Sequence, residues 1–180
     1  MEKLVIDQLH PDFEAVYNAA LIIKRKNPKV VHPSDLETIS TQIFVDDKGV
    51  LVATNGIILF KAKVKDIKSG RYEVHKLSKK SVSLYSVAPT VKYPNYAMVI
   101  DPDKDIKMLP LPEYIKTVPK ELTKSLLCNF VSKQFDIAID VDNLVVDLAK
   151  FDVVGLGWEK LIFKTTNRAS WVFLVMALKV

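Results

Sequence analysis

The segment GVLVATNGIILFKAKV, residues 49–64, contains the pattern that decides the fold. Residues 50–54 are mostly apolar, residues 54–56 (Thr-Asn-Gly) have the composition of a turn, and a second apolar run follows. That second run alternates apolar with charged residues: Phe60, Ala62 and Val64 with Lys61, Lys63 and Lys65. Strict period two indicates a strand with one buried face and one face that carries ammonium groups. The segment therefore predicts two antiparallel strands joined by a tight turn.

Strand patterns continue on both sides of this segment. Residues 39–45 are expected to pair with residues 50–54 across an Asp-Asp-Lys-Gly turn, where Gly49 can take the positive φ of a tight hairpin. Residues 70–77 have a strand pattern, and residues 78–87 fit a strand or a short helix. Further strands are predicted near the two ends of the sequence, over residues 3–9, 153–158, 159–166 and 170–178.

Two main helices are predicted. Apolar residues recur at helical spacing from Phe13 onward, and this helix ends in the basic sequence KRKNP at residues 24–28. The apolar positions are Phe13, Val16, Tyr17, Ala20 and Ile23. A second helix is predicted over residues 140–151, with Asp140 or Asp142 as its N-cap.

The segment between these helices is predicted to be irregular at first. Residues 101–125 contain several prolines, so a loop excursion with one or two helical turns is expected there. Strands are expected again over residues 125–131 and 135–140. The order of one strand, one helix and several strands thus occurs twice, which is typical of an α+β fold with mostly antiparallel sheets.

Composition excludes several classes of protein. With 180 residues, 49% hydrophobic and 26% charged, the chain can fill one core or two small ones. No apolar run approaches the roughly 20 residues of a membrane span, and the N-terminus does not resemble a signal peptide, so a cytoplasmic protein without membrane contact is expected. The single cysteine, Cys128, excludes an internal disulfide, and the three histidines show no metal spacing.

Motifs for catalysis or cofactor binding are weak. Gly155-Leu156-Gly157 lacks the third glycine of a dinucleotide fingerprint. The triplet Asp101, Asp103, Asp105 begins like a calcium loop, but Ile106 and Pro112 stand where that loop needs glycine and glutamate. Cys128 lies in an apolar run, where cysteine usually behaves as a small hydrophobe. We therefore expect no catalytic residue, no metal and no cofactor, while an enzyme on this fold stays an alternative because catalytic groups meet in space.

The net charge of +5 is distributed unevenly. Residues 21–30 are basic without any acid, and residues 61–80 are also rich in lysine, whereas residues 135–152 are acidic. Basic clusters suit a polyanion such as nucleic acid, but they also suit a solvated surface. The lysines at the end of the first helix have a structural reason as well, because cations are favourable at a helix C-terminus.

Three segments, taken in order, resemble the bacterial sliding clamp, the β subunit of the replicative DNA polymerase. Residues 49–64 are similar to the family hairpin with its Thr-Asp-Gly-His-Arg-Leu signature, and VKYPNYAMVI (91–100) to its Arg-Phe-Pro-Asp-Tyr-Arg-Arg-Val segment. SWVFLVMAL (170–178) resembles the closing strand, which ends near Val-Met-Pro-Met. The resemblance implies a single clamp-like domain over residues 1–180, with a proline-rich insertion near 101–125; a rearranged pair of half-domains is the alternative architecture.

The resemblance also implies a partner pocket, which in the family accepts short peptides of replication proteins. The matching positions are Thr54, Gly56, Ile57, Ile58, Leu59, Pro94, Met98, Val99, Leu174, Val175 and Met176. Asn55, Ile57, Ile58 and Met98 replace polar family residues, so a more apolar pocket is expected. Ordinary core packing is an equal alternative for these positions.

DNA contact is the other implication of the resemblance. The expected contacts are non-specific and made to phosphates by Lys24, Arg25, Lys26 and Lys29. The family forms rings, so a homo-oligomer is expected, although an acidic second helix at 140–151 argues against a simple ring of identical chains. A protein-interaction module without DNA binding is the alternative function.

Overall fold

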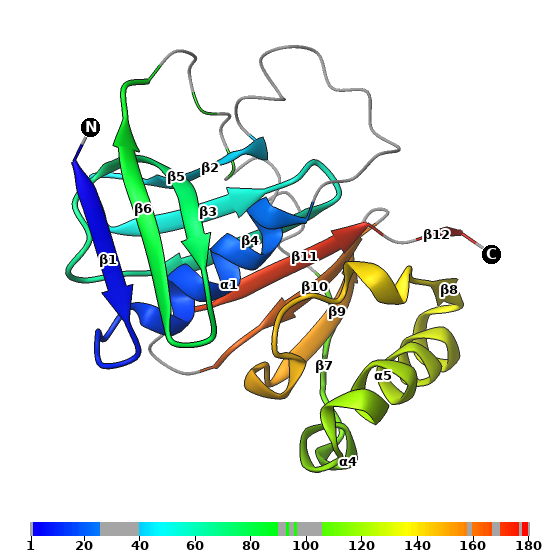
Figure 1. Ribbon diagram of the computed structural model, residues 1–180. Helices are drawn as coiled ribbons and strands as arrows, with labels where there is room; N and C mark the ends of the chain where they lie inside the picture. Colours follow the sequence, from blue (N-terminus) through cyan, green and yellow to red (C-terminus); the bar gives the residue numbers. More distant parts are fainter. Residues whose placement is uncertain are drawn as a thin grey trace. The chain divides into compact units, whose positions relative to one another are not determined.

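The computed structural model describes residues 2–25, 40–89, 93, 96, 106–157, 160–166, 170–176 and 178–179. The chain divides into two compact units, Met1–Tyr96 and Ala97–Val180 (Figure 1). The prediction of one clamp-like domain over residues 1–180, with an insertion near 101–125, stays a prediction.

The first unit is an antiparallel sheet with one helix against it (Figure 1). Its strands stand in the order β1, β6, β5, β2, β3, β4. In chain order the elements are β1 (Lys3–Asp7), α1 (Phe13–Lys24), β2 (Gln42–Val45), β3 (Val50–Thr54), β4 (Ile58–Lys63), β5 (Gly70–Leu77) and β6 (Ser81–Val87). Residues 78–87, predicted as a strand or a short helix, therefore contain a strand.

The predicted hairpin of β2 and β3 is confirmed, with Phe44 opposite Val52. Gly49 closes the turn with a φ of +70°, and a Cβ there would lie 2.7 Å from the carbonyl oxygen of Val64. Only glycine fits this position without strain. The alternation in β4 is confirmed as well, because Phe60 and Ala62 are buried while Lys63 is exposed.

The buried face of helix α1 differs from the predicted one. Val16, Ala19 and Ile22 are fully buried, whereas Phe13 and Tyr17 are half-buried and stack on each other with ring centroids 5.6 Å apart. Small alanines let the helix approach the sheet closely, and the two aromatic rings cover its margin. The helix and its approximate bounds are confirmed, but the assignment of one apolar face was only partly right.

Two polar side chains attach α1 to the two ends of β4. At the start of α1, the carboxylate of buried Asp12 accepts backbone N–H bonds from Lys65 at 3.0 Å and from Asp66 at 2.8 Å. At its end, the side-chain Nδ2 of buried Asn55 donates to the carbonyl oxygen of Arg25 at 3.3 Å. Because both contacts satisfy backbone groups that lose water on folding, they set where the helix begins and ends on the sheet.

Two tyrosines at the end of the first unit lie against the β2–β3 hairpin. The ring of Tyr93 stacks on Phe44 with centroids 4.6 Å apart, and Tyr96 Oη donates to Asp46 Oδ2 at 2.7 Å. Burial acts to raise the pKa of Asp46, but the hydrogen bonds from Tyr96 and from backbone N–H groups of the turn outweigh it, so this pKa is lowered.

The second unit has strands in the order β11, β10, β9, β7, and a small pair of β12 with β8. Helix α5 contacts β8, α4 and both 3-10 turns. The elements are β7 (Met108–Pro110), α4 (Glu113–Thr117), α5 (Lys120–Phe135), β8 (Ile137–Ala138), η1 (Val141–Asn143), η2 (Leu148–Lys150), β9 (Val153–Gly157), β10 (Lys160–Lys164), β11 (Val172–Met176) and β12 (Leu178–Lys179). The three late strands of the prediction correspond to β9, β10 and β11.

An aromatic cluster forms the core of the second unit. Phe151 contacts Phe163, Phe173 and Trp171 at centroid distances of 6.1–6.3 Å, and the three phenylalanines are fully buried. Gly155 has a structural role in β9, because a Cβ there would lie 2.5 Å from Ile106 and 2.6 Å from the sulfur of Met108. This glycine lets β7 pair closely with β9.

The second helix was predicted at the wrong position in the sequence. Residues 140–151 form the 3-10 turns η1 and η2, and the second main helix is α5, over residues predicted as loop and as the strand 125–131. The predicted strand 135–140 is reduced to β8. Prolines caused the first error: Pro112 and Pro119 stand just before α4 and α5, where a missing N–H costs nothing.

The hydrophobic pattern explains the rest of this correction. In α5 the buried positions Thr123, Leu127 and Val131 recur every four residues, as a helix requires. In residues 144–148 the buried side chains alternate instead, which a regular helix does not allow.

The attachment of α1 by Asp12 predicts a clear effect on stability. Asp12→Ala leaves two backbone N–H groups without their acceptor, so the free energy of unfolding should fall by about 2–4 kcal/mol. The matched control is Asp66→Ala, because Asp66 is exposed and contributes its backbone N–H to the contact; it should change stability by less than about 0.5 kcal/mol. Urea denaturation measures both. Equal losses in the two variants would contradict this role of Asp12.

The Tyr96–Asp46 contact predicts a pH-dependent effect. The lowered pKa of Asp46 means that its contribution is present above the ordinary value of 3.8 and is lost as the pH falls through the folded-state pKa, below 3.8. Tyr96→Phe should therefore cost about 1 kcal/mol at pH 7 and much less at pH 2.5. Denaturation of both proteins at the two pH values measures this. A difference that does not change with pH would contradict the contact.

Candidate nucleic-acid interface and partner pocket

The Thr-Asn-Gly turn between β3 and β4 holds itself together through its own side chains. Thr54 Oγ1 donates to the carbonyl oxygen of Ile58 at 2.8 Å and accepts from the N–H of Gly56 at 3.1 Å. Asn55 Oδ1 accepts the N–H groups of Ile57 at 3.2 Å and Ile58 at 3.0 Å. Gly56 has a φ of +89°, which favours glycine. Thr54 and Gly56, predicted to line a pocket, thus have a structural reason to be present.

The same turn positions the basic end of α1. Asn55 uses its oxygen for the turn and its nitrogen for the carbonyl of Arg25, so one buried side chain joins both features. Lys24 is exposed in the last turn of the helix, and Arg25 is half-buried immediately after it. Lys26 and Lys29, the other predicted DNA contacts, lie outside the described residues.

The predicted pocket residues differ in burial. Ile58, Leu59, Leu174 and Val175 are buried, with exposures of 8% or less. Ile57 is half-buried, and Met176 is 45% exposed at the end of β11. The remaining positions, Pro94, Met98 and Val99, lie outside the described residues. The predicted pocket role of these positions stays a prediction.

The lysine row of β4 lies away from α1. Side chains alternate across a strand, and the face with Phe60 and Ala62 is buried where α1 packs, so Lys61 and Lys63 lie on the other face. On that face the guanidinium of buried Arg71 lies 5.8 Å from the ring centroid of Tyr93. The lysine row and the basic end of α1 therefore do not form one continuous surface of the sheet.

Helix α5 carries basic residues that the prediction missed. Its sequence contains Lys120, Lys124 and Lys133 with Glu121 as its acid. The signal was present in the sequence: after Pro119, residues 120–135 contain neither proline nor glycine. Cys128 lies half-buried in this helix, and burial raises the pKa of its thiol, so it stays protonated at neutral pH.

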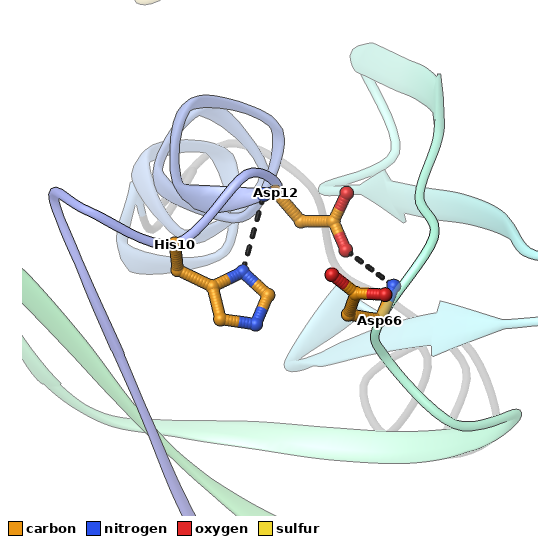
Figure 2. A group of neighbouring side chains, drawn as sticks. All are labelled: His10, Asp12 and Asp66. Carbon is orange, nitrogen blue, oxygen red and sulfur yellow. Dashed lines mark hydrogen bonds between the residues drawn. The ribbon is translucent and has the colours of Figure 1, made fainter.

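His10, Asp12 and Asp66 gather at the start of α1 (Figure 2). Their potential ligand atoms lie within 4.8 Å of one another. The Nδ1 of His10, however, accepts the backbone N–H of Asp12 at 3.1 Å, which places the proton of the neutral imidazole on Nε2. Neither ring nitrogen then offers a lone pair to a cation, so the geometry favours a hydrogen-bonded cluster that fixes the helix start.

No helix in the described part of the chain is long and apolar enough to cross a membrane. No protein-family model matches the sequence, and no curated protein matches it. The fold itself is similar to solved structures. DNA polymerase III subunit beta from Borrelia burgdorferi matches with a TM-score of 0.56 at 13% identity, and the match covers 100% of this chain. The chain has the fold of a bacterial sliding clamp.

A second sliding clamp matches in the same way. The DNA polymerase sliding clamp from Pseudomonas aeruginosa has a TM-score of 0.50 at 10% identity, over 99% of this chain. These matches cover 65% of the Borrelia clamp and 67% of the Pseudomonas clamp, so this chain is shorter than either. The α+β clamp-like fold inferred from the three sequence segments is confirmed.

The double role of Asn55 can be tested by a variant that keeps the side-chain oxygen and loses the side-chain nitrogen. Asn55→Asp keeps the oxygen that accepts from Ile57 and Ile58 but removes the donor to Arg25. Amide hydrogen exchange should therefore stay slow at Ile58. The end of α1 should fray once the carbonyl of Arg25 loses its partner, so the N–H of Arg25, which donates to the carbonyl oxygen of Ile22, should exchange at least about tenfold faster. Asn55→Ala is the control, since it should accelerate exchange at both positions. Unchanged exchange at Arg25 in Asn55→Asp would contradict the attachment.

Proposed function

We propose that the protein is a non-enzymatic, cytoplasmic replication accessory protein of the sliding-clamp type. It binds DNA through non-specific phosphate contacts and docks short peptides of replication proteins. The observation that carries this proposal is the clamp fold, together with Lys24 and Arg25 at the end of α1 and the three lysines of α5. Residues 140–151 form 3-10 turns and not the acidic second helix that argued against a ring of identical chains. The second main helix is α5, which contains three lysines and one glutamate.

The DNA contact is proposed for the end of α1. Lys24 and Arg25 are the first of four basic residues at positions 24, 25, 26 and 29. The hydrogen bond from Asn55 holds the backbone at Arg25 in place, so the side chains of Lys24 and Arg25 extend from a backbone of defined position. Cations that neutralise phosphates release counterions, which gives affinity without reading the base sequence.

A peptide contact is proposed, from the resemblance to the clamp family, for the apolar positions that match the family pocket. Ile57 and Met176 are the members of this set with exposed surface among the described residues, so they are the proposed peptide contacts. Pro94, Met98 and Val99 complete the proposed pocket. An apolar surface of this kind suits a peptide with hydrophobic anchors.

DNA binding is tested with a double charge reversal. Lys24→Glu/Arg25→Glu should weaken binding to duplex DNA of any sequence by at least about tenfold at 50 mM salt, and should reduce the slope of log affinity against log salt by about 2. Fluorescence anisotropy over a salt series measures both. The matched control is Lys76→Glu, an exposed charge in β5, which should leave the slope within about 0.5 of the wild-type value.

Two results would contradict the proposal. One is a wild-type protein with no salt-dependent DNA affinity. The other is a double variant that binds DNA like the wild type. In either case the second candidate function, a protein-interaction module on the clamp fold, is favoured, since Lys24 also has a structural reason at the helix C-terminus.

A further inference from the structure

Strand β1 forms one edge of the sheet in the first unit (Figure 1). It pairs with β6 in a regular antiparallel register, from Lys3 opposite Tyr85 to Asp7 opposite Ser81. No other described strand pairs with it. The register contains no shift, and the strand contains no proline, so β1 lacks two of the devices by which proteins block edge pairing.

The free edge of β1 presents a defined set of backbone groups. The carbonyl of Glu2 accepts from Ser86, and the N–H of Gln8 donates to Lys80, so the even-numbered residues face β6. Because the direction alternates along an antiparallel strand, the N–H and C=O groups of residues 3, 5 and 7 point away from the sheet. The carbonyl oxygen of Asp7 accepts the N–H of His10 at 3.0 Å, so the groups available to another strand are the N–H and C=O of residues 3 and 5 and the N–H of Asp7.

The side chains of β1 are ordered symmetrically about Val5. Lys3 and Asp7, both exposed, lie two residues to either side, with opposite charges. Leu4 and Ile6 lie one residue to either side, on the face toward α1, where Leu4 is half-buried and Ile6 fully buried. Val5 itself is 54% exposed, on the same face as Lys3 and Asp7. The sequence Lys-Leu-Val-Ile-Asp is therefore complementary to itself when run in the opposite direction.

We propose that β1 pairs antiparallel with β1 of a second copy of this chain, about a two-fold axis at Val5. Each Lys3 then lies opposite Asp7 of the second copy, and each Leu4 opposite its Ile6. The two Val5 residues exchange both of their N–H···O=C bonds, because these groups point outward. Opposite charges and apolar side chains that lie directly opposite each other stabilise an antiparallel strand pair. A different partner strand, with charges of one sign only, would place a like charge opposite either Lys3 or Asp7.

The interface is small. A strand of five residues buries far less than the roughly 800 Å² per partner of a standard interface, so the dimer is weak and depends on concentration. The inference rests on the clamp-type function proposed above, for which a homo-oligomer is expected, and it names a surface for that oligomer. It requires no DNA. A two-fold contact closes after two copies, so it joins chains in pairs and does not by itself form a ring.

Charge reversal on the two sides of Val5 tests the pairing. Lys3→Glu alone places glutamate opposite Asp7 twice, and Asp7→Lys alone places lysine opposite Lys3 twice, so each variant should dimerise at least about tenfold more weakly than the wild type. Mixed together, the two variants pair glutamate with lysine and Asp7 with Lys3, so heterodimers should form at the wild-type affinity. Sedimentation equilibrium over a concentration series measures this, without DNA.

Further variants control for folding. Asp7→Lys also removes the hydrogen bond from the N–H of Leu9 to Asp7 Oδ1, so its fold is checked by circular dichroism. Val5→Pro is the independent test, since the N–H of residue 5 points outward and its loss leaves the pairing with β6 intact; it should be monomeric. Lys76→Glu, on β5, should dimerise like the wild type.

Three results would overturn the inference: a wild-type protein that is monomeric at every concentration, single variants that dimerise like the wild type, or folded variants that do not pair when mixed. None of these three measurements involves DNA, so each is separate from the test of DNA binding. Salt-dependent DNA affinity of the wild type, measured separately, reports on that function even where the dimer is absent.

Discussion

The position of α1 against β4 is the constraint on which the first unit depends. Two buried polar side chains set it: Asp12 accepts backbone N–H groups just after β4, and Asn55 donates to the end of the helix from the turn just before β4. Hydrophobic burial alone would hold the helix on the sheet without fixing its register along the strands. The two hydrogen-bonded contacts supply that register, because each buried partner left unpaired would cost about 1–3 kcal/mol.

Asn55 also connects the fold to the proposed function. The side chain lies at the position where the clamp signature has aspartate, and its amide nitrogen makes the contact to Arg25 that a carboxylate could not donate. The asparagine that replaces the signature aspartate therefore has a structural role in the first unit. It holds the backbone at Arg25, directly after Lys24. The turn, the helix end and the proposed phosphate contacts thus depend on one buried amide.

Much of the first unit could be predicted from sequence, because its signals are local. Period-two alternation in β4, Gly49 in the hairpin turn and the helical spacing after Phe13 each reflect one element in contact with one core. The second unit was harder. Pro119 marks the start of α5, yet proline is equally a loop signal, and buried side chains alternate with half-buried ones over residues 144–148 instead of following helical periodicity. The turns η1 and η2 pack against α5, and η2 also against α4, and no short window of sequence contains these contacts.

The candidate site could be predicted only in part. The clamp fold followed from three short segments, and the structure confirms it. The contacts that give Asn55 and Asp12 their roles join residues that are 30 and more positions apart, so no sequence motif displays them. The self-complementary order of residues 3–7 is visible in the sequence, but it gains meaning only once β1 is known to lie at a sheet edge.

The most direct test of the central claim is the mass of the protein in solution with and without a duplex DNA of random sequence. A clamp-type accessory protein should move from a mixture of single chains and weak dimers to a complex in which several copies share one DNA molecule, and added salt should reverse the change. A protein that keeps the mass of a free chain or dimer in the presence of DNA, at low salt, would contradict the account.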